Sequence, residues 1–393
     1  MNQRTIPAEL WRGGTSKGLF LFEPDLPDDL PARDALLARL IGSPDPYGKQ
    51  IDGLGGGTSS TSKVVLVRPS RRPDCAVEYR FGAVTVDRPV IDWSGNCGNL
   101  TTAVAPFAIL HGLVAATEGE TTVPMWQDNI GKRIVARVPV SGGQPLEHGS
   151  FLMDGVAFPG AEILLEFIDP GGGESSMLPT GSVLDILDVP GVGRIDATLV
   201  NAGNPTVFID AGTLGLTGAE LPEEINSRAS LLLACEAVRA AGAVLMGLAD
   251  SPEAATRSRP ATPKLSFVAP TTTYRSASGR TIESGEADLL ARILSMGRLH
   301  HAYTGTGAIA LAVAAALPGS VVARVIRSGP ASRVRIGHVS GTMTVGAEVV
   351  REGTSWRVDR ALMSRSARRL MSGVVHLPGN ALGGTGSPAA FAT

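Results

Sequence analysis

Two stretches of the chain place a reactive side chain beside a dense group of hydrogen-bond donors. The first is GLGGGTSSTSK over 53–63, where five consecutive hydroxyl residues precede Lys63. The lysine leads directly into the apolar run VVLV, so burial would lower the pKa of its amine and make it a usable base. The glycines and hydroxyls, among them Ser60 and Ser62, could bind carboxylates. The alternative interpretation is a serine-rich turn with a solvated lysine.

This stretch does not fit a phosphate-binding loop. Such a loop requires the pattern GxxxxGK[ST], in which a glycine precedes the lysine and a hydroxyl residue follows it. Here Ser62 precedes Lys63 and Val64 follows it. The sequence therefore argues against nucleotide binding.

The second stretch is DWSGNCGN over 92–99, which ends where an apolar helix is expected to begin. A cysteine at a helix N-terminus lies near the positive end of the helix dipole and near unpaired N–H groups, which favour the thiolate form of Cys97. Gly98 would let a substrate reach the sulfur and the amides together. The alternative is a small buried side chain, but the polar neighbours Asn96 and Asn99 argue against simple core packing.

A third candidate is RGGTSKG over 12–18, which again combines glycine, hydroxyl and cation. Thr15, Ser16 and the backbone amides could bind a second carboxylate. A surface turn with Lys17 in water is an equally good interpretation.

Several other chemistries lack their motifs. The six histidines include no HExxH pair, and adjacent His300 and His301 are expected to point in different directions, so we predict no metal site. GxSxG occurs only as GTSKG at 14–18, which leads into an expected strand and not into the helix that a nucleophile elbow needs, and GxGxxG is absent after the early strands; both observations weaken the hydrolase and dehydrogenase interpretations.

The charge balance argues against nucleic acid as a partner. With 35 basic and 37 acidic residues the chain has a net charge of −2, so any anion must be bound locally. The basic segment 360–369, RALMSRSARR, could be a nucleic-acid patch, but a solvated helix face is the commoner meaning of such a pattern.

The cysteines and the apolar runs bear on the compartment. Cys75, Cys97 and Cys235 cannot form a disulfide scaffold, which fits a reducing cytosol. The apolar stretch 308–318 is far shorter than the ~20 residues that span a bilayer. We expect a cytoplasmic protein without membrane association.

The order of elements predicts two lobes. A loop rich in glycine, serine and proline, 169–180, is the expected linker, and we place the lobes at 1–182 and 183–393. Cys97-Gly98-Asn99 opens one apolar helix and Thr304-Gly305-Thr306-Gly307 opens another, so the chain could be two similar halves, although any buried helix entered through a tight turn gives this pattern. Among the other expected elements are a helix over 288–295 and a strand over 321–326.

Taken together, RGGTSKG at 12–18, KQIDGLGGGTSSTSK at 49–63 and DWSGNCGN at 92–99 closely resemble the PrpF family, the 2-methylaconitate cis-trans isomerases. WQDNIGK at 126–132, SMGRLHHA at 295–302, GHVSGT at 337–342 and MSRSAR at 363–368 extend the likeness over nearly the whole chain. The resemblance implies an α+β, diaminopimelate epimerase-like fold. Such a fold has two pseudo-symmetric lobes, each a mixed sheet curled around a central helix, with the active site in the cleft between them.

The resemblance also implies that Lys63 and Cys97 are the catalytic acid and base. Cofactor-independent epimerases of this fold use two facing cysteines, whereas the second position here is Thr304, which cannot act as a thiolate base. This departure fits an isomerase that removes a proton from the carbon next to a C=C bond, forms a dienolate, and returns the proton after rotation. The implied substrate-binding residues are Thr15, Ser16, Ser60, Ser62, Asn96, Gly98, Asn99, Thr304, Ser340 and Gly341.

No cofactor is implied, and the implied partner is a small di- or tricarboxylate, with a homodimer possible for the protein. The resemblance places the reaction in propionate catabolism through the methylcitrate cycle. Aconitate isomerisation and oxalomesaconate tautomerisation are alternative reactions of the same site. A non-catalytic protein that binds a tricarboxylate for a partner enzyme is the alternative from another class.

Overall fold

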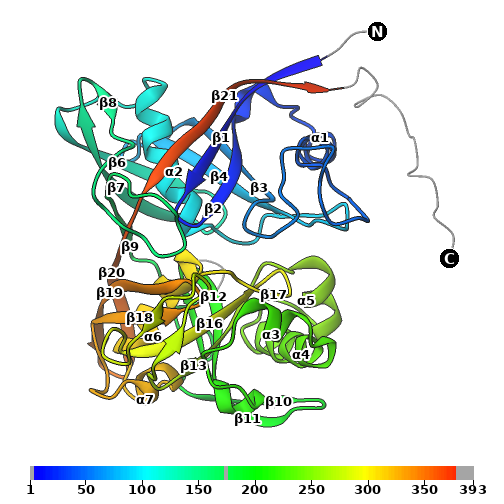
Figure 1. Ribbon diagram of the computed structural model, residues 1–393, viewed down its shortest axis with the longest axis vertical. Coiled ribbons are helices and arrows are strands. Elements are labelled where there is room, and N and C mark those ends of the chain that lie inside the picture. Colours follow the sequence, from blue (N-terminus) through cyan, green and yellow to red (C-terminus); the bar gives the residue numbers. More distant parts are fainter. Residues whose placement is uncertain (1–3, 172–175, 378–393) are drawn as a thin grey trace, which may run out of the picture.

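The computed structural model describes residues 4–171 and 176–377, and it shows two bodies stacked along the long axis (Figure 1). The early part of the chain, coloured blue to cyan, builds the upper body, and residues from the green to the orange range build most of the lower one. Residues 172–175 of the expected linker lie outside the described residues.

The upper body is a mixed sheet wrapped around one buried helix, α2 (Gly98–Leu110). Its strands, in spatial order, are β21 (Ala367–Leu377), β1 (Arg4–Gly13), β2 (Ser16–Phe22), β3 (Lys63–Pro69), β4 (Val77–Val84), β6 (Gly119–Gln127), β7 (Lys132–Ser141) and β9 (Ile163–Ile168). Short strands β5 (Ile91–Asp92) and β8 (Gln144–Pro145) extend it. The outer helices are η1 (Glu23–Asp25) and α1 (Leu30–Ile41).

The lower body repeats this plan around α6 (Gly305–Ala316). Its strands, in spatial order, are β20 (Ser355–Arg365), β19 (Gly341–Glu352), β18 (Arg333–His338), β16 (Leu289–Ser295), β13 (Lys264–Ala269), β12 (Asn204–Asp210), β11 (Gly193–Ala202) and β10 (Asp185–Val189). Smaller strands are β14 (Tyr274–Arg275), β15 (Thr281–Ile282) and β17 (Arg298–Leu299). The remaining helices are η2 (Ala211–Leu214), α3 (Pro222–Asn226), α4 (Ala229–Leu245), α5 (Pro252–Ser258) and α7 (Val321–Val325).

The two bodies have the same sequence of strand directions. Starting from β21 in one body and β10 in the other, the neighbouring pairs run antiparallel, antiparallel, parallel, antiparallel, parallel, antiparallel and antiparallel. Parallel neighbours need a crossover; in each body outer helices connect the first parallel pair, and the buried helix connects the second. The fold is the expected α+β arrangement of two similar lobes, each curled around a central helix.

The central helices are helices because their surroundings are apolar on every side. Residues 98–109 of α2 and 305–315 of α6 are all buried. The Thr304 side chain caps α6 by accepting a hydrogen bond from the Gly307 N–H, whereas the Cys97 side chain makes no cap bond at the start of α2. Each helix N-terminus points toward the junction of the two bodies, as Figure 1 shows for α6.

Three expected elements are wrong. Residues 289–295 form strand β16 and not a helix, because all seven side chains are buried between β13 and β18; a short apolar run does not distinguish a buried strand from a buried helix. Val321–Val325 is helix α7 and not a strand, and the Ser320 side chain caps it by accepting from the Ala323 N–H. The basic segment 360–369 lies in strands β20 and β21, not on a helix face.

Two strand pairings tie the bodies together. β20 pairs with β9, which joins both sheets edge to edge, and β21 then returns to pair with β1 along its whole length. Figure 1 shows β21, in red, crossing from the lower body to the upper one. The division at residues 182 and 183 stays a prediction, and it must accommodate this returning strand. In the part of the chain that the structure describes, helices are too short or too polar to cross a bilayer.

Candidate functional site

The N-termini of the two central helices meet backbone to backbone at two glycines. A Cβ atom on Gly98 would lie 2.8 Å from the Thr306 amide nitrogen, and a Cβ on Gly305 would lie 2.9 Å from the Gly98 carbonyl carbon. Only glycine permits this approach. It brings Cys97 and Thr304, the residues that precede the two helices, into the lining of one small buried pocket of about 30 Å³.

This inner pocket gathers most of the site residues expected from the sequence. Both predicted catalytic residues, Lys63 and Cys97, line it. The other expected residues in its lining are Ser16, Asn96, Gly98, Asn99 and Thr304. These last five residues come from the β1–β2 turn and the N-terminal ends of the two central helices. The fold therefore places side chains from distant parts of the chain around one space.

Lys63 is the first residue of β3, and its side chain is buried against Phe81, with Nζ 5.2 Å from the ring centroid. Within the described part of the chain, its amine has no hydrogen-bond partner or carboxylate neighbour at salt-bridge distance. Burial lowers its pKa, and the neighbouring Cys97 opposes that shift. A lysine in these surroundings loses its proton more easily than one in water.

Cys97 lies at the junction between the loop and α2, half-buried. Its Sγ is 3.9 Å from the Ser16 hydroxyl oxygen, and its N–H donates to the Asn96 side-chain oxygen over 2.7 Å. The same Asn96 oxygen accepts from the Thr101 hydroxyl, so the amide nitrogen of Asn96 faces the other way. That nitrogen is buried and has no partner among the described residues, which leaves a donor for a ligand.

A second lysine, Lys264, lines the inner pocket and was not predicted from the sequence. It is the first residue of β13, the strand that corresponds to β3 in the lower body, and it is buried. Burial, followed by the charge of Lys63, lowers its pKa to about 8. In contrast to Lys63 it is anchored, because Nζ donates to the Ala261 carbonyl over 3.1 Å and to the Ser295 hydroxyl over 3.5 Å. The signal that marked Lys63, a lysine opening an apolar run, is also present in KLSFVA.

The hydroxyls of the β1–β2 turn are oriented from behind by two buried side chains. The Asn99 amide nitrogen donates to the Thr15 hydroxyl over 2.9 Å and to the Ser16 hydroxyl over 3.5 Å. The Asn99 oxygen accepts from Arg365 Nε over 3.2 Å, and this contact fixes which way the amide faces. Arg365 is buried without a salt-bridge partner in the described chain, and burial lowers its pKa to about 10. The sequence did not indicate Arg365.

Asn204 holds the loop before α2 in place from the other body. Its side-chain oxygen accepts from the Asn96 N–H over 2.8 Å, and its side-chain nitrogen donates to the Asn96 carbonyl over 2.8 Å. The Asp92 carboxylate adds a bond to the Ala261 N–H over 2.7 Å. Asn204 too was missed, because its role depends on the packing of the two bodies.

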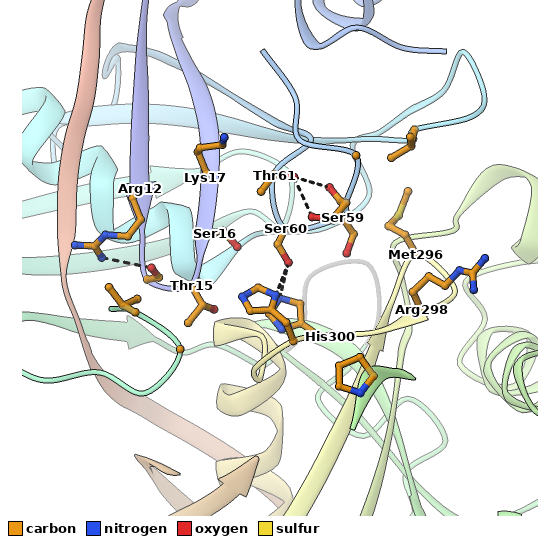
Figure 2. Close-up of a pocket in the computed structure, with 18 of the residues that line it drawn as sticks. Arg12, Thr15, Ser16, Lys17, Ser59, Ser60, Thr61, Met296, Arg298 and His300 are labelled. Atoms are coloured by element: carbon orange, nitrogen blue, oxygen red, sulfur yellow. Dashed lines mark hydrogen bonds between the residues drawn. The ribbon is translucent and has the colours of Figure 1, made fainter. Parts of the chain in front are cut away.

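A much larger cleft of about 970 Å³ lies next to the inner pocket, and Ser16 and His300 line both. Figure 2 shows this cleft, with Thr15, Ser16, Ser60 and His300 gathered near its centre. The Ser60 hydroxyl lies 3.3 Å from His300 Nε2 and 3.0 Å from His301 Nδ1. The two imidazoles stack with centroids 4.5 Å apart, so the expectation that they point in different directions is wrong. Burial lowers the pKa of both, which favours neutral rings.

Three expected substrate-binding residues line neither the inner pocket nor the cleft. The Ser62 hydroxyl is fully buried and donates to the Gln50 side chain and the Thr58 carbonyl. The Ser340 hydroxyl donates to the His301 carbonyl, and the Gly341 carbonyl accepts from the Tyr274 hydroxyl. These residues support the loops around the site.

The pocket can therefore perform proton transfer next to an anion. The Lys63 amine, which makes no hydrogen bond to the described residues, and the Cys97 thiol line the same space. An anchored lysine, an unpaired amide N–H and the N-terminus of α2 supply positive charge and donors that could stabilise a carboxylate or an enolate. The described side chains that line the inner pocket include no Asp or Glu, so an anionic ligand meets no opposing carboxylate there.

Comparisons with known proteins agree with this picture. The family model described as PrpF protein matches residues 3–378. A protein of Shewanella oneidensis described as 2-methyl-aconitate isomerase is 51% identical over 388 residues, covering 96% of this chain and 98% of its own. The crystal structure of methylitaconate-delta-isomerase matches with a TM-score of 0.76 at 37% identity, covering 98% of this chain and 99% of that one. A probable proline racemase from Agrobacterium radiobacter, at 16% identity and TM-score 0.55 over 96% of each chain, shares the fold.

Proposed function

The chain belongs to the PrpF family, and from that premise we propose that it is a cofactor-independent isomerase that interconverts the cis and trans isomers of 2-methylaconitate. The observation that carries the proposal is the inner pocket. There, the Lys63 amine, which lacks a hydrogen-bond partner in the described chain, and the Cys97 thiol line the same buried space. The similarity to 2-methyl-aconitate isomerase over nearly the full length of both chains supports the choice of substrate.

The reaction begins when neutral Lys63 removes a proton from the carbon next to the C=C bond. The C–H electrons form a new C=C bond, and the electrons of the original double bond move onto the carboxylate, which gives a dienolate. The former double bond is now single, so it can rotate. When Lys63 returns its proton to the same carbon, the electrons move back and the other isomer is fixed.

The dienolate needs more stabilisation than the substrate does, because negative charge accumulates on one carboxylate. Lys264 is placed to bind that carboxylate as a cation, and the amides of Gly98 and Asn99 at the start of α2 add donors. Asn96 contributes its unpartnered side-chain nitrogen. Thr15 and Ser16, oriented by Asn99, and Ser60 are candidates to bind the remaining carboxylates.

The hydrogen bonds assign different roles to the two lysines. Two buried ammonium groups near each other repel, so the pair loses one proton more easily than an isolated lysine would. The Ala261 carbonyl accepts a hydrogen bond from Lys264 Nζ and so favours its protonated form, whereas Lys63 has no such acceptor among the described residues. We therefore assign Lys63 as the base, and Cys97 as the acid or a polarising partner.

Related acids are the main alternative substrates. The solved relative is named for methylitaconate, whose reaction moves a double bond, and the same pocket would serve if Cys97 delivered the proton to a different carbon. Aconitate and oxalomesaconate are further candidates. The proposed physiological setting is the cytoplasm and propionate breakdown through the methylcitrate cycle, with a homodimer as the proposed assembly.

Proton NMR in deuterated water tests the proposal. The purified protein is incubated without cofactor with the cis and trans isomers of 2-methylaconitate and of aconitate. We expect interconversion of the methylaconitates with deuterium entering the allylic position. Lys63→Ala should abolish exchange and turnover, and Cys97→Ser should lower turnover while the acid still binds.

Two results would contradict the proposal. If all acids remain unchanged while their signals shift saturably, the protein binds tricarboxylates without catalysis. If Lys63→Ala isomerises methylaconitate as fast as the unmodified protein, the base has been assigned to the wrong residue.

A further inference from the structure

The large cleft outside the inner pocket carries a concentrated positive charge. Its lining includes five basic side chains and only two acidic ones, Asp87 and Glu147. The basic residues are Arg12, Lys17, Arg88, Arg298 and Arg368. The cleft therefore has a formal charge of +3, from five minus two, with its histidines neutral, whereas the whole chain has a net charge of −2.

Most of these charges are not neutralised by nearby carboxylates. Arg88 lies 3.8 Å from Asp87, but Lys17, Arg298 and Arg368 form no ion pair within the described part of the chain. Arg298 donates to the Asn226 carbonyl over 3.0 Å, which positions the guanidinium without cancelling its charge. Figure 2 shows Lys17 and Arg298 on different sides of the cleft.

The cleft that these cations line adjoins the inner pocket, which is too small to hold a polycarboxylate as it stands. At about 30 Å³ it has room for about two water molecules, far less than a tricarboxylate needs. The cleft has a volume of about 970 Å³ and shares Ser16 and His300 with the inner pocket. A ligand in the cleft would thus lie next to the inner pocket, which must widen to admit it.

We propose that this cleft is an outer binding station for small polycarboxylates, in which Lys17 of the upper body and Arg298 of the lower body hold the anion before it enters the inner pocket. A concave site lined by one sign of charge raises the local concentration of the oppositely charged ligand. Both bodies contribute cations to this cleft. The station depends on the proposed function only for what happens to the ligand afterwards.

Calorimetric titration with propane-1,2,3-tricarboxylate tests the station without turnover, because this saturated acid has no double bond to isomerise. We expect its Kd to rise about tenfold as NaCl increases from 20 to 300 mM, because salt screens the cations. The double variant Lys17→Gln/Arg298→Gln should bind about tenfold more weakly at low salt and depend less on salt. The matched control, Arg71→Gln/Arg194→Gln, removes one exposed charge from each body outside the cleft and should bind like the unmodified protein.

Two outcomes would overturn the station. One is an unchanged Kd and salt dependence in the Lys17→Gln/Arg298→Gln variant. The other is an equal loss of affinity in the control, which would show only the effect of overall charge. The station and the proposed isomerase can fail independently. If the protein converts no acid in the NMR experiment but the titrations behave as expected, the station stands and the isomerase does not. If the protein is active but the double variant binds the tricarboxylate as tightly as the unmodified protein, the isomerase stands and the station does not.

Discussion

The position of one proton decides how the two pocket lysines work. An ordinary lysine amine is protonated near neutral pH and cannot act as a base. Burial lowers the pKa of both Lys63 and Lys264, and the charge of Lys63 lowers the pKa of Lys264 further. Because repulsion between two charges is mutual, it favours one neutral amine in the pair.

The repulsion predicts how the pH dependence of kcat/KM responds to Lys264→Met. With Lys63 as the proposed base, activity requires its neutral form, so the acidic limb should rise with pH through the lowered pKa of Lys63. Removing the Lys264 charge raises that pKa toward its ordinary value, and the acidic limb should move to higher pH. Initial rates from pH 6 to 10 measure this shift; a limb that stays in place or moves to lower pH would contradict the coupling.

The variant Asn99→Asp should weaken substrate binding without lowering the stability of the fold. The carboxylate would gain an ion pair with buried Arg365, so the melting temperature should not fall. The same carboxylate cannot donate to Thr15 and Ser16, and it adds negative charge beside the substrate. We expect KM to rise at least about tenfold, the equivalent of one lost hydrogen bond to a charged group. Thermal denaturation and steady-state kinetics test this pair of effects, and an unchanged KM would rule out the role of Asn99.

Local sequence signals identified some residues of the site and missed others for a physical reason. Lys63 and Cys97 each stand beside glycines or hydroxyls in one short stretch, so their surroundings can be read from neighbouring positions. Asn204 and Arg365 act on Asn96 and Asn99 from positions more than 100 residues away. Their roles appear only when the two bodies are packed together.

At the scale of elements, the contact between the N-termini of α2 and α6 is the most sensitive part of the fold. Gly305→Ala would place Cβ 2.9 Å from the Gly98 carbonyl carbon and 3.0 Å from the Asn99 nitrogen. Backbone cannot yield as a flexible side chain can, so we expect a loss of about 1–3 kcal/mol in the free energy of unfolding and a large drop in kcat. Gly373→Ala, whose Cβ meets no atom within 4 Å, is the control and should stay within about 0.5 kcal/mol. Urea denaturation of both variants checks this; equal stability would show that the helix ends can separate freely.

Element type was predictable where length or capping decided it. The central helices α2 and α6 are long apolar runs opened by tight turns, and both were expected near their observed positions. Strand β16 was expected to be a helix and helix α7 a strand, because runs of seven and five apolar-rich residues fit either structure. Their type is set by neighbours: β16 completes a ladder between β13 and β18, which the local sequence does not reveal.

At the scale of the whole molecule, the chain repeats one design and then breaks its symmetry at the site. Lys63 and Lys264 open corresponding strands, and Cys97 and Thr304 precede corresponding helices. The lysine is therefore present twice, but the thiol only once. Two facing thiols would serve proton transfer on both faces of a carbon, whereas one thiol and two amines suit removal and return of a proton beside bound carboxylates.

Asn204 of the lower body holds the loop before α2 of the upper body, and this contact predicts the effect of Asn204→Ala. The substitution leaves the Asn96 N–H unpaired between the bodies and leaves its carbonyl with only the Thr306 hydroxyl as a donor, at 3.3 Å, so the free energy of unfolding should fall by about 1–3 kcal/mol. Because Asn96 also accepts the Cys97 N–H, kcat should fall more than stability explains, measured at a temperature where the variant is fully folded. Ser320→Ala is the control: the Ser320 hydroxyl donates to the Ala314 carbonyl and accepts from the Ala323 N–H within the lower body, so its loss should lower the melting temperature while leaving kcat close to that of the unmodified protein. Equal kcat losses in the two variants would mean that general loosening, and not the register of one body against the other, limits catalysis.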